Sequence, residues 1–165
     1  MGNNLTVNIY GGTFGKKTDT SNSAAAFFGT PVSDNTKRAE VNILGGAFYG
    51  YRSDVMSVFR FVNLTIGQEG GSNAAIVLQN AGQDESAALS IQDDFFYTYG
   101  YGNRGSQVMI RSGTLTGTGM AIYFGSSAET VKLSGGIFET AKYNGQPLTG
   151  TYYYGESYIL VTGYK

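Results

Sequence analysis

Val41-Asn42-Ile43-Leu44-Gly45-Gly46-Ala47-Phe48 decides the fold of this chain, because the phrase occurs three times. Close copies stand at residues 7–14 (VNIYGGTF) and 131–138 (VKLSGGIF). In each copy apolar and polar residues alternate with the period of a β-strand, and the strand runs into a Gly-Gly corner that closes on a phenylalanine. The repeated unit is therefore a strand and a bend, and recurrence of such a unit is typical of repeat proteins.

Weaker copies of the phrase lie between these three, and all six align on their first residue. Four of the five successive spacings fall between 21 and 25 residues. Residues i and i+2 of a strand share a face, so the first and third positions of the copies are expected to stack into two buried columns. The first column contains Val7, Val41, Val62, Ala87, Val108 and Val131, and the second contains Ile9, Ile43, Leu64, Leu89, Ile110 and Leu133.

The length of the repeat favours a parallel β-helix of about six rungs. A β-sandwich is the alternative, although its strands and turns recur about every 8–12 residues, more often than the copies seen here. We expect one domain over residues 1–165, with an inserted loop region at 16–38 that is rich in Thr, Ser, Asn and Asp. Because the chain begins and ends inside repeat-like sequence, it is expected to be a segment of a longer protein.

The Val-x-Ile-x-Gly-Gly-x-Phe phrase resembles the repeats of right-handed parallel β-helices of the pectin-lyase-like fold, as found in large bacterial cell-surface proteins. The resemblance covers nearly the whole chain and implies a right-handed solenoid. Relatives of that fold include polysaccharide lyases and hydrolases, and also non-catalytic surface modules and adhesins. The polygalacturonase-type enzymes use a Gly-His pair and an Arg-Ile-Lys tripeptide, neither of which this chain contains.

The composition excludes several classes of function. The 165 residues include no cysteine and no histidine, which removes disulfides, thiol nucleophiles, histidine acid/base chemistry and the common zinc sites. The formal net charge of -1 with scattered Lys and Arg gives no footprint for a nucleic-acid partner. No apolar stretch approaches the ~18 residues of a membrane span, so none is expected.

An acidic cluster is the first candidate site. In the aligned register Glu69 on one rung lies beside Asp93 and Asp94 on the next, and adjacent strands are about 4.8 Å apart. These carboxylates would then share a calcium ion or act as a catalytic pair, with Arg104 or Arg111 holding a substrate carboxylate. The other interpretation is a solvated acidic corner with no chemistry.

Tyrosines are the second candidate. Tyr97, Tyr99 and Tyr101 alternate, so on a strand they would share one face and offer rings that stack on sugars or grip another protein. The alternative is that these rings fill the interior of a rung or cover an end of the stack.

The function expected from these features is a non-catalytic extracellular module of the bacterial cell surface, which adheres to glycans or to a host or cell-surface protein. One alternative is a lyase or hydrolase acting on acidic polysaccharides, centred on the acidic cluster. Another is a structural stalk without a ligand. No cofactor is expected apart from a possible calcium ion, and the sequence leaves the oligomeric state open.

Overall fold

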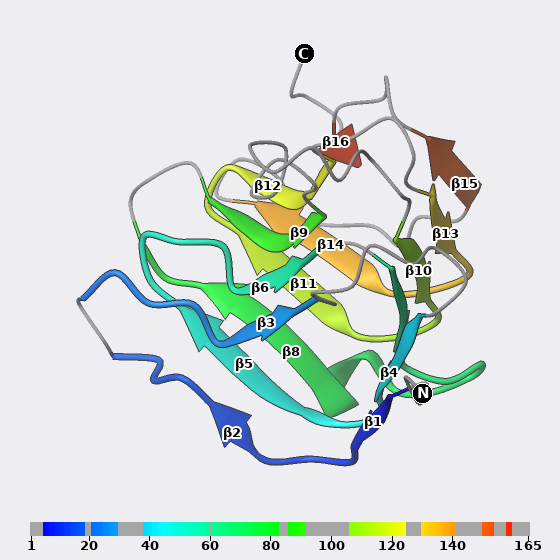
Figure 1. The fold of residues 1–165 in the computed structure, drawn as a ribbon. Coiled ribbons are helices and arrows are strands. Elements are labelled where there is room, and N and C mark those ends of the chain that lie inside the picture. Colours follow the sequence, from blue (N-terminus) through cyan, green and yellow to red (C-terminus); the bar gives the residue numbers. More distant parts are fainter. Residues whose placement is uncertain are drawn as a thin grey trace.

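The computed structural model describes residues 5–18, 21–29, 38–59, 61–82, 86–91, 106–124, 130–140, 150–153 and 158–159. Their regular secondary structure is nearly all β-strand, and the helical content is one 3-10 turn, η1 (Asn73–Ala75) (Figure 1). The described part contains no helix long and apolar enough to cross a membrane.

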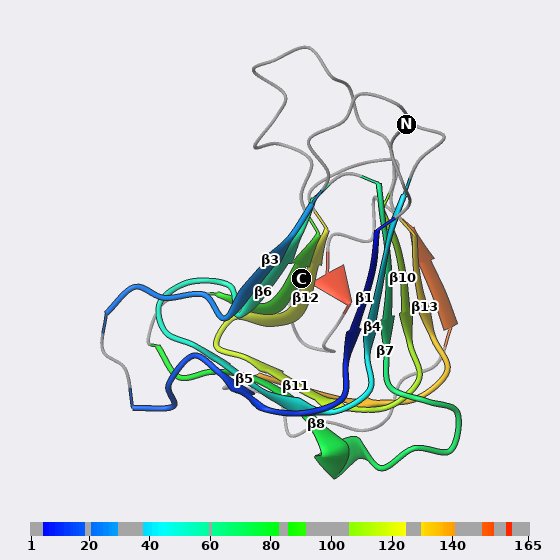
Figure 2. The ribbon, with the colours of Figure 1, turned by 60° about the horizontal axis from the view of Figure 1, so that its bottom comes forward.

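The strands form three sheets that enclose the core as three walls (Figure 2). The first sheet has the order β1 (Thr6–Ile9), β4 (Ala39–Ile43), β7 (Val62–Ile66), β10 (Gln107–Ile110), β13 (Thr130–Leu133) and β15 (Gly150–Tyr153). The second has the order β2 (Thr13–Phe14), β5 (Gly46–Gly50), β8 (Ile76–Asn80), β11 (Thr114–Gly117) and β14 (Ile137–Thr140). The third has the order β3 (Ala26–Phe28), β6 (Met56–Val58), β9 (Ala87–Ile91), β12 (Met120–Phe124) and β16 (Tyr158–Ile159).

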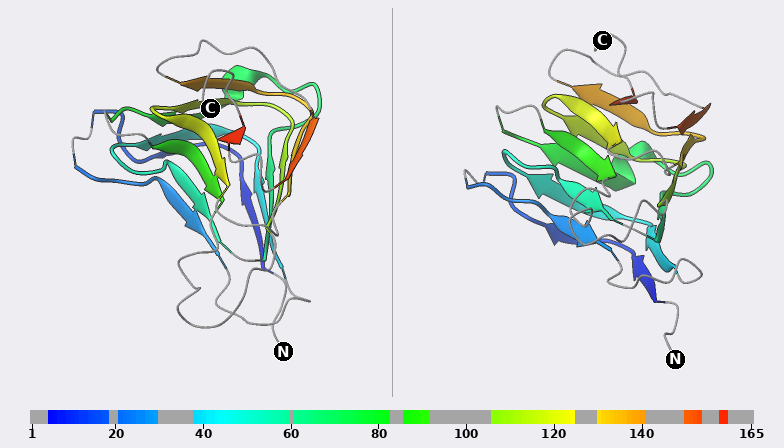
Figure 3. Two further views of the ribbon diagram at one scale, coloured as in Figure 1. Left: turned by 90° about the horizontal axis from the view of Figure 1, so that it is seen from above. Right: turned by 45° about the horizontal axis from the view of Figure 1, so that its top comes forward.

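The chain visits the three sheets in turn, so each coil contributes one strand to each wall. Eleven of the thirteen strand pairs are parallel. The two antiparallel pairs join β15 to β13 and β16 to β12, at the C-terminal end of the stack (Figure 3). The arrangement fits a parallel β-solenoid, and it differs from a sandwich built of antiparallel hairpins.

The described residues form four complete coils and the first two strands of a fifth, one fewer than the six rungs expected. The expected column of first positions is correct for Val7, Val41, Val108 and Val131. It is wrong at Ala87, because β9 pairs with β6 and β12 in the third sheet. The segment that was counted as a separate rung is thus the third strand of the third coil.

The register of β7 is also shifted by two residues from the expected one. Leu64 stacks on Val41, and Ile66 takes the place in the Ile43 column that was expected for Leu64. A shift of two keeps every side chain on its own face, so the inward pattern of β7 is unchanged. The second column therefore contains Ile9, Ile43, Ile66, Ile110 and Leu133, while Leu89 stacks between Met56 and Ile122.

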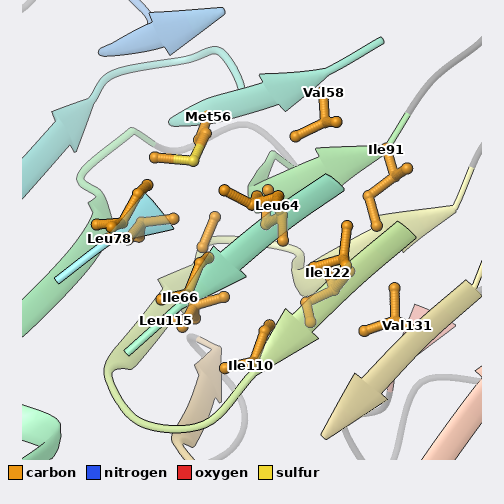
Figure 4. Packing of buried hydrophobic residues seen from close by; sticks show 14 of the residues in the cluster. Met56, Val58, Leu64, Ile66, Leu78, Ile91, Ile110, Leu115, Ile122 and Val131 are labelled. Carbon is orange, nitrogen blue, oxygen red and sulfur yellow. The ribbon is translucent and has the colours of Figure 1, made fainter. Parts of the chain in front are cut away.

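Aliphatic side chains from all three walls meet inside the coils (Figure 4). Leu64, Leu78 and Ile122 are each at most 1% exposed. Phe14 and Phe48, which close the phrase in the first two coils, stack with ring centroids 4.6 Å apart. Like residues therefore pack on like from coil to coil, as the columns predicted.

The Gly-Gly corner joins the first sheet to the second. Gly46 has a φ of 121°, a conformation that residues with a Cβ rarely adopt. A Cβ added at Gly45 would lie 2.5 Å from the carbonyl oxygen of Tyr10 in the preceding coil. The first glycine is thus required by close stacking of the coils, and the second by the turn itself.

Two segments interrupt the regular coil. In the third coil, residues 67–75 form a longer corner that carries η1 and stands out from the stack (Figure 2). Within the expected loop region 16–38, Ala26–Phe28 forms β3 and joins the third sheet. Residues 19–20 and 30–37 of that region lie outside the described residues.

Candidate functional site

The outer face of the first sheet carries columns of polar side chains, because the residues between the buried aliphatic positions point away from the core. Asn42 Nδ2 donates to Asn8 Oδ1 of the coil before it, at 2.9 Å. In the neighbouring column Asn63 Nδ2 donates to Glu40 Oε1 at 2.5 Å. Side-chain hydrogen bonds thus link successive coils on this face.

A surface groove of about 460 Å³ lies on this face, across β7, β10 and β13. Its polar side chains come from alternate positions of adjacent strands, with Gln107 aligned on Asn63 and Met109 aligned on Thr65. Among the described residues, those that line the groove are Asn63, Leu64, Thr65, Gln107, Val108, Met109, Arg111 and Lys132.

The groove has a positive character. Lys132 is aligned with Met109, and Arg111 lies two residues beyond Met109, just past the end of β10. Both cations are exposed, and the part of the lining that the structure describes includes no Asp or Glu. Glu40 stands in the same column as Asn63 and Gln107, and its carboxylate accepts the bond from Asn63.

Asn63 contributes an unpaired acceptor to the lining. The bond to Glu40 fixes which end of the amide is the NH₂ group, because a carboxylate only accepts. The carbonyl oxygen Oδ1 is then buried without a hydrogen-bond partner in the described structure. A buried acceptor left unpaired costs free energy, and because Oδ1 is closed to solvent a ligand in the groove does not reach it in this conformation.

The structure bears on the acidic cluster only in part. Glu69 is exposed in the corner loop between β7 and β8, within the first-to-second-sheet connection. Asp93, Asp94 and Arg104 lie outside the described residues. The register that placed Glu69 beside Asp94 is wrong, because β9 belongs to the third sheet. The described residues contain no group of three or more acidic side chains that would hold a metal ion, and calcium at this cluster stays a prediction.

Of the remaining predicted site residues, Arg111 is described by the structure and the three tyrosines are not. Arg111 lines the groove on the first sheet, and its role beside the acidic cluster stays a prediction. Tyr97, Tyr99 and Tyr101 lie outside the described residues, so their sugar-binding face stays a prediction.

Sequence reasoning missed the groove, although a signal for it was present. Asn63 and Lys132 are outward positions of the phrase, and Gln107 and Met109 follow the same alternation. This outward pattern alone predicts that the amide of Gln107, the thioether of Met109 and the ammonium group of Lys132 lie close together. Nothing in the sequence indicated the hollow between them.

No protein-family model, no curated protein and no solved structure matches this chain. The assignment of a function therefore rests on the solenoid and on the chemistry of its faces.

Proposed function

We propose that this chain is a non-catalytic extracellular module of a bacterial surface protein, and that it binds a glycan in the groove on the first sheet. The observation that carries the proposal is the groove itself, where polar side chains from three adjacent strands converge on one hollow. A linear chain of sugars crossing the strands would meet one coil after another at a spacing of about 4.8 Å.

The lining suits a sugar chemically. The amides of Asn63 and Gln107 and the hydroxyl of Thr65 supply both donors and acceptors, which matches the dual character of sugar hydroxyl groups. Met109 adds a flexible apolar surface for the C–H face of a ring. Binding sites of this kind combine a few placed polar groups with apolar contact.

We infer a right-handed winding for the coils and a relationship to the pectin-lyase-like surface proteins. Strand-to-parallel-strand crossovers within one sheet are right-handed in about 98% of cases, and each coil here is such a crossover. The Gly-Gly-x-Phe phrase supports the relationship, and the extracellular location follows from that resemblance alone.

The experiment is a glycan array followed by titration calorimetry with the strongest ligand. Two double variants of equal composition are compared with the unmodified chain. The first, Gln107→Ala with Lys132→Ala, removes an amide and an ammonium group from the groove. The second, Gln79→Ala with Lys16→Ala, removes the same groups elsewhere, from the second sheet and from an exposed position after β2.

We expect the groove variant to bind about tenfold or more weakly and the control variant to bind like the unmodified chain. Absence of any bound glycan contradicts the proposed function. Equal binding by both variants leaves glycan binding intact but removes it from the groove. New reducing or unsaturated ends in the bound polysaccharide contradict the non-catalytic assignment.

A further inference from the structure

Charge is unevenly distributed around the groove. Lys132 on β13 and Arg111, just past the end of β10, line it from one side, and both are exposed. Glu40 on β4 stands beyond the opposite side, where its carboxylate accepts a hydrogen bond from Asn63 on β7. Strands β4, β7, β10 and β13 follow one another in the first sheet (Figure 2). The groove therefore has a positive end, and an acidic side chain adjoins its other end.

The positive end is suited to an anion. Arginine presents a planar fork of donors that matches the oxygens of a carboxylate or a sulfate, and lysine adds a compact charge. The described lining offers no carboxylate to pair with Lys132 or Arg111. Arg38, which precedes β4, and Glu69, in the corner loop after β7, lie outside the lining. An anionic group on the ligand supplies the charge that this end lacks.

The other end disfavours a second anion. Asn63 aligns with Glu40 on the neighbouring strand, and adjacent strands are about 4.8 Å apart. An anion held over Asn63 would approach the Glu40 carboxylate, and like charges at such a distance repel even when salt screens them in part. The uncharged amide and hydroxyl groups of Asn63, Thr65 and Gln107 are instead suited to the hydroxyl groups of a neutral sugar. From β7 to β13 the sheet spans about 10 Å, which separates the neutral contacts from the cationic ones.

We propose that the ligand is a largely neutral glycan with a single anionic group, which Lys132 and Arg111 bind at the end of the groove over β10 and β13. This inference rests on the proposed glycan-binding function and adds the chemical class of the ligand. The anion is the carboxylate of an acidic terminal sugar or a sulfate ester on a terminal sugar, because both present oxygens that the two cations bind. A chain that is acidic at every sugar binds more weakly, since it brings a second anion toward Glu40.

A glycan array tests the class of ligand with the full chain. Its glycans include neutral cores alone, the same cores capped with one N-acetylneuraminic acid, the same cores with one terminal sulfate ester, and oligomers of galacturonic acid. The capped and the sulfated cores distinguish the two sources of the anion. Titration calorimetry at low and at physiological salt then measures the affinities of the strongest ligand and of its uncharged core, since salt weakens the charged contact and leaves the neutral ones.

Single variants assign the charges to residues. Lys132→Gln and Arg111→Gln each remove one positive charge and keep a long polar side chain. Lys16→Gln is the matched control, because Lys16 is exposed after β2 and lies outside the lining. Glu40→Gln removes the negative charge and retains a carbonyl oxygen that accepts from Asn63. Circular dichroism and the unfolding midpoint establish that each variant is folded.

We expect the singly anionic glycan to bind about tenfold more tightly than its neutral core. Lys132→Gln and Arg111→Gln should each weaken binding of that glycan about fivefold or more and leave binding of the core unchanged, whereas Lys16→Gln should change neither. Glu40→Gln should bring the galacturonate oligomers closer in affinity to the singly anionic glycan.

Equal binding of the core and the capped core overturns this inference and leaves the proposed function standing. Cation variants that lose no more affinity for the anionic glycan than for its core have the same meaning, as do galacturonate oligomers that bind as tightly as the singly anionic glycan. An array without any bound glycan overturns the proposed function and, with it, this inference.

Discussion

A buried leucine and an exposed one separate the contribution of coil stacking from that of composition. Leu64 lies in the third coil between Val41 and Val108, and it is 1% exposed. Leu5 lies in the first coil and is 63% exposed. Leu→Ala at either position removes the same atoms, so any difference in cost reports how many coils surround the side chain.

The magnitude follows from burial. Three carbons removed at about 0.8 kcal/mol each give a transfer loss of about 2.4 kcal/mol for Leu64→Ala. The cavity left between two rigid neighbouring coils raises the total to about 3–4 kcal/mol. Leu5→Ala loses roughly a third of the transfer term and leaves no cavity, so we expect less than about 1 kcal/mol.

Urea denaturation followed by circular dichroism measures both free energies of unfolding. Both variants and the unmodified chain are measured at the same protein concentration. The denaturant dependence should stay the same, and the midpoint should fall far more for Leu64→Ala. Equal losses at the two positions would show that Leu64 is not enclosed by coils on both sides, and the stacked register would have to be abandoned.

Further predictions concern the corners. Gly45→Ala should lower the free energy of unfolding by about 1–3 kcal/mol, because its Cβ would lie 2.5 Å from Tyr10 O. A Cβ at Gly11 in the first coil would meet nothing within 4 Å, so Gly11→Ala should lower the free energy of unfolding by less than about 0.5 kcal/mol. Thermal and urea unfolding of the pair test this, and a costly Gly11→Ala would count against it. Asn73→Ala should cost about 1–3 kcal/mol and speed proteolysis at residues 67–75, since Asn73 Oδ1 accepts from the buried N–H of Gly113 at 3.0 Å. Unchanged cleavage there would mean that this bond does not anchor the loop.

The sequence predicted the parallel repeat and its inward columns because the pattern of buried residues is local. It misplaced the third coil because Leu64 and Val108, which are aligned across β7 and β10, are 44 residues apart. The regular interval is 23 residues, from Val41 to Leu64 and from Val108 to Val131. An interval near twice that length suggested an additional rung at Ala87, whereas the structure has one long coil with an extended corner.

The two-residue shift at β7 has a different cause. Val62, Leu64 and Ile66 are all apolar and inward, so two alignments bury the same face and the hydrophobic pattern does not distinguish them. The groove could not be predicted for a related reason. The groove forms only because β7 and β10 are neighbours in the first sheet. The two strands are neighbours because β8 and β9 belong to the same long coil as β7, with no further strand of the first sheet between them.

The strand register itself is measured most directly by nuclear Overhauser spectroscopy on the labelled 165-residue chain. Parallel pairs lack the short Hα–Hα contacts of antiparallel pairs, and the pairing partners fix the alignment. We expect contacts that align Ile43 with Ile66 and Ile66 with Ile110, without strong Hα–Hα contacts across β4, β7 and β10. Strong Hα–Hα contacts between those strands, or an alignment of Ile43 with Leu64, would contradict it.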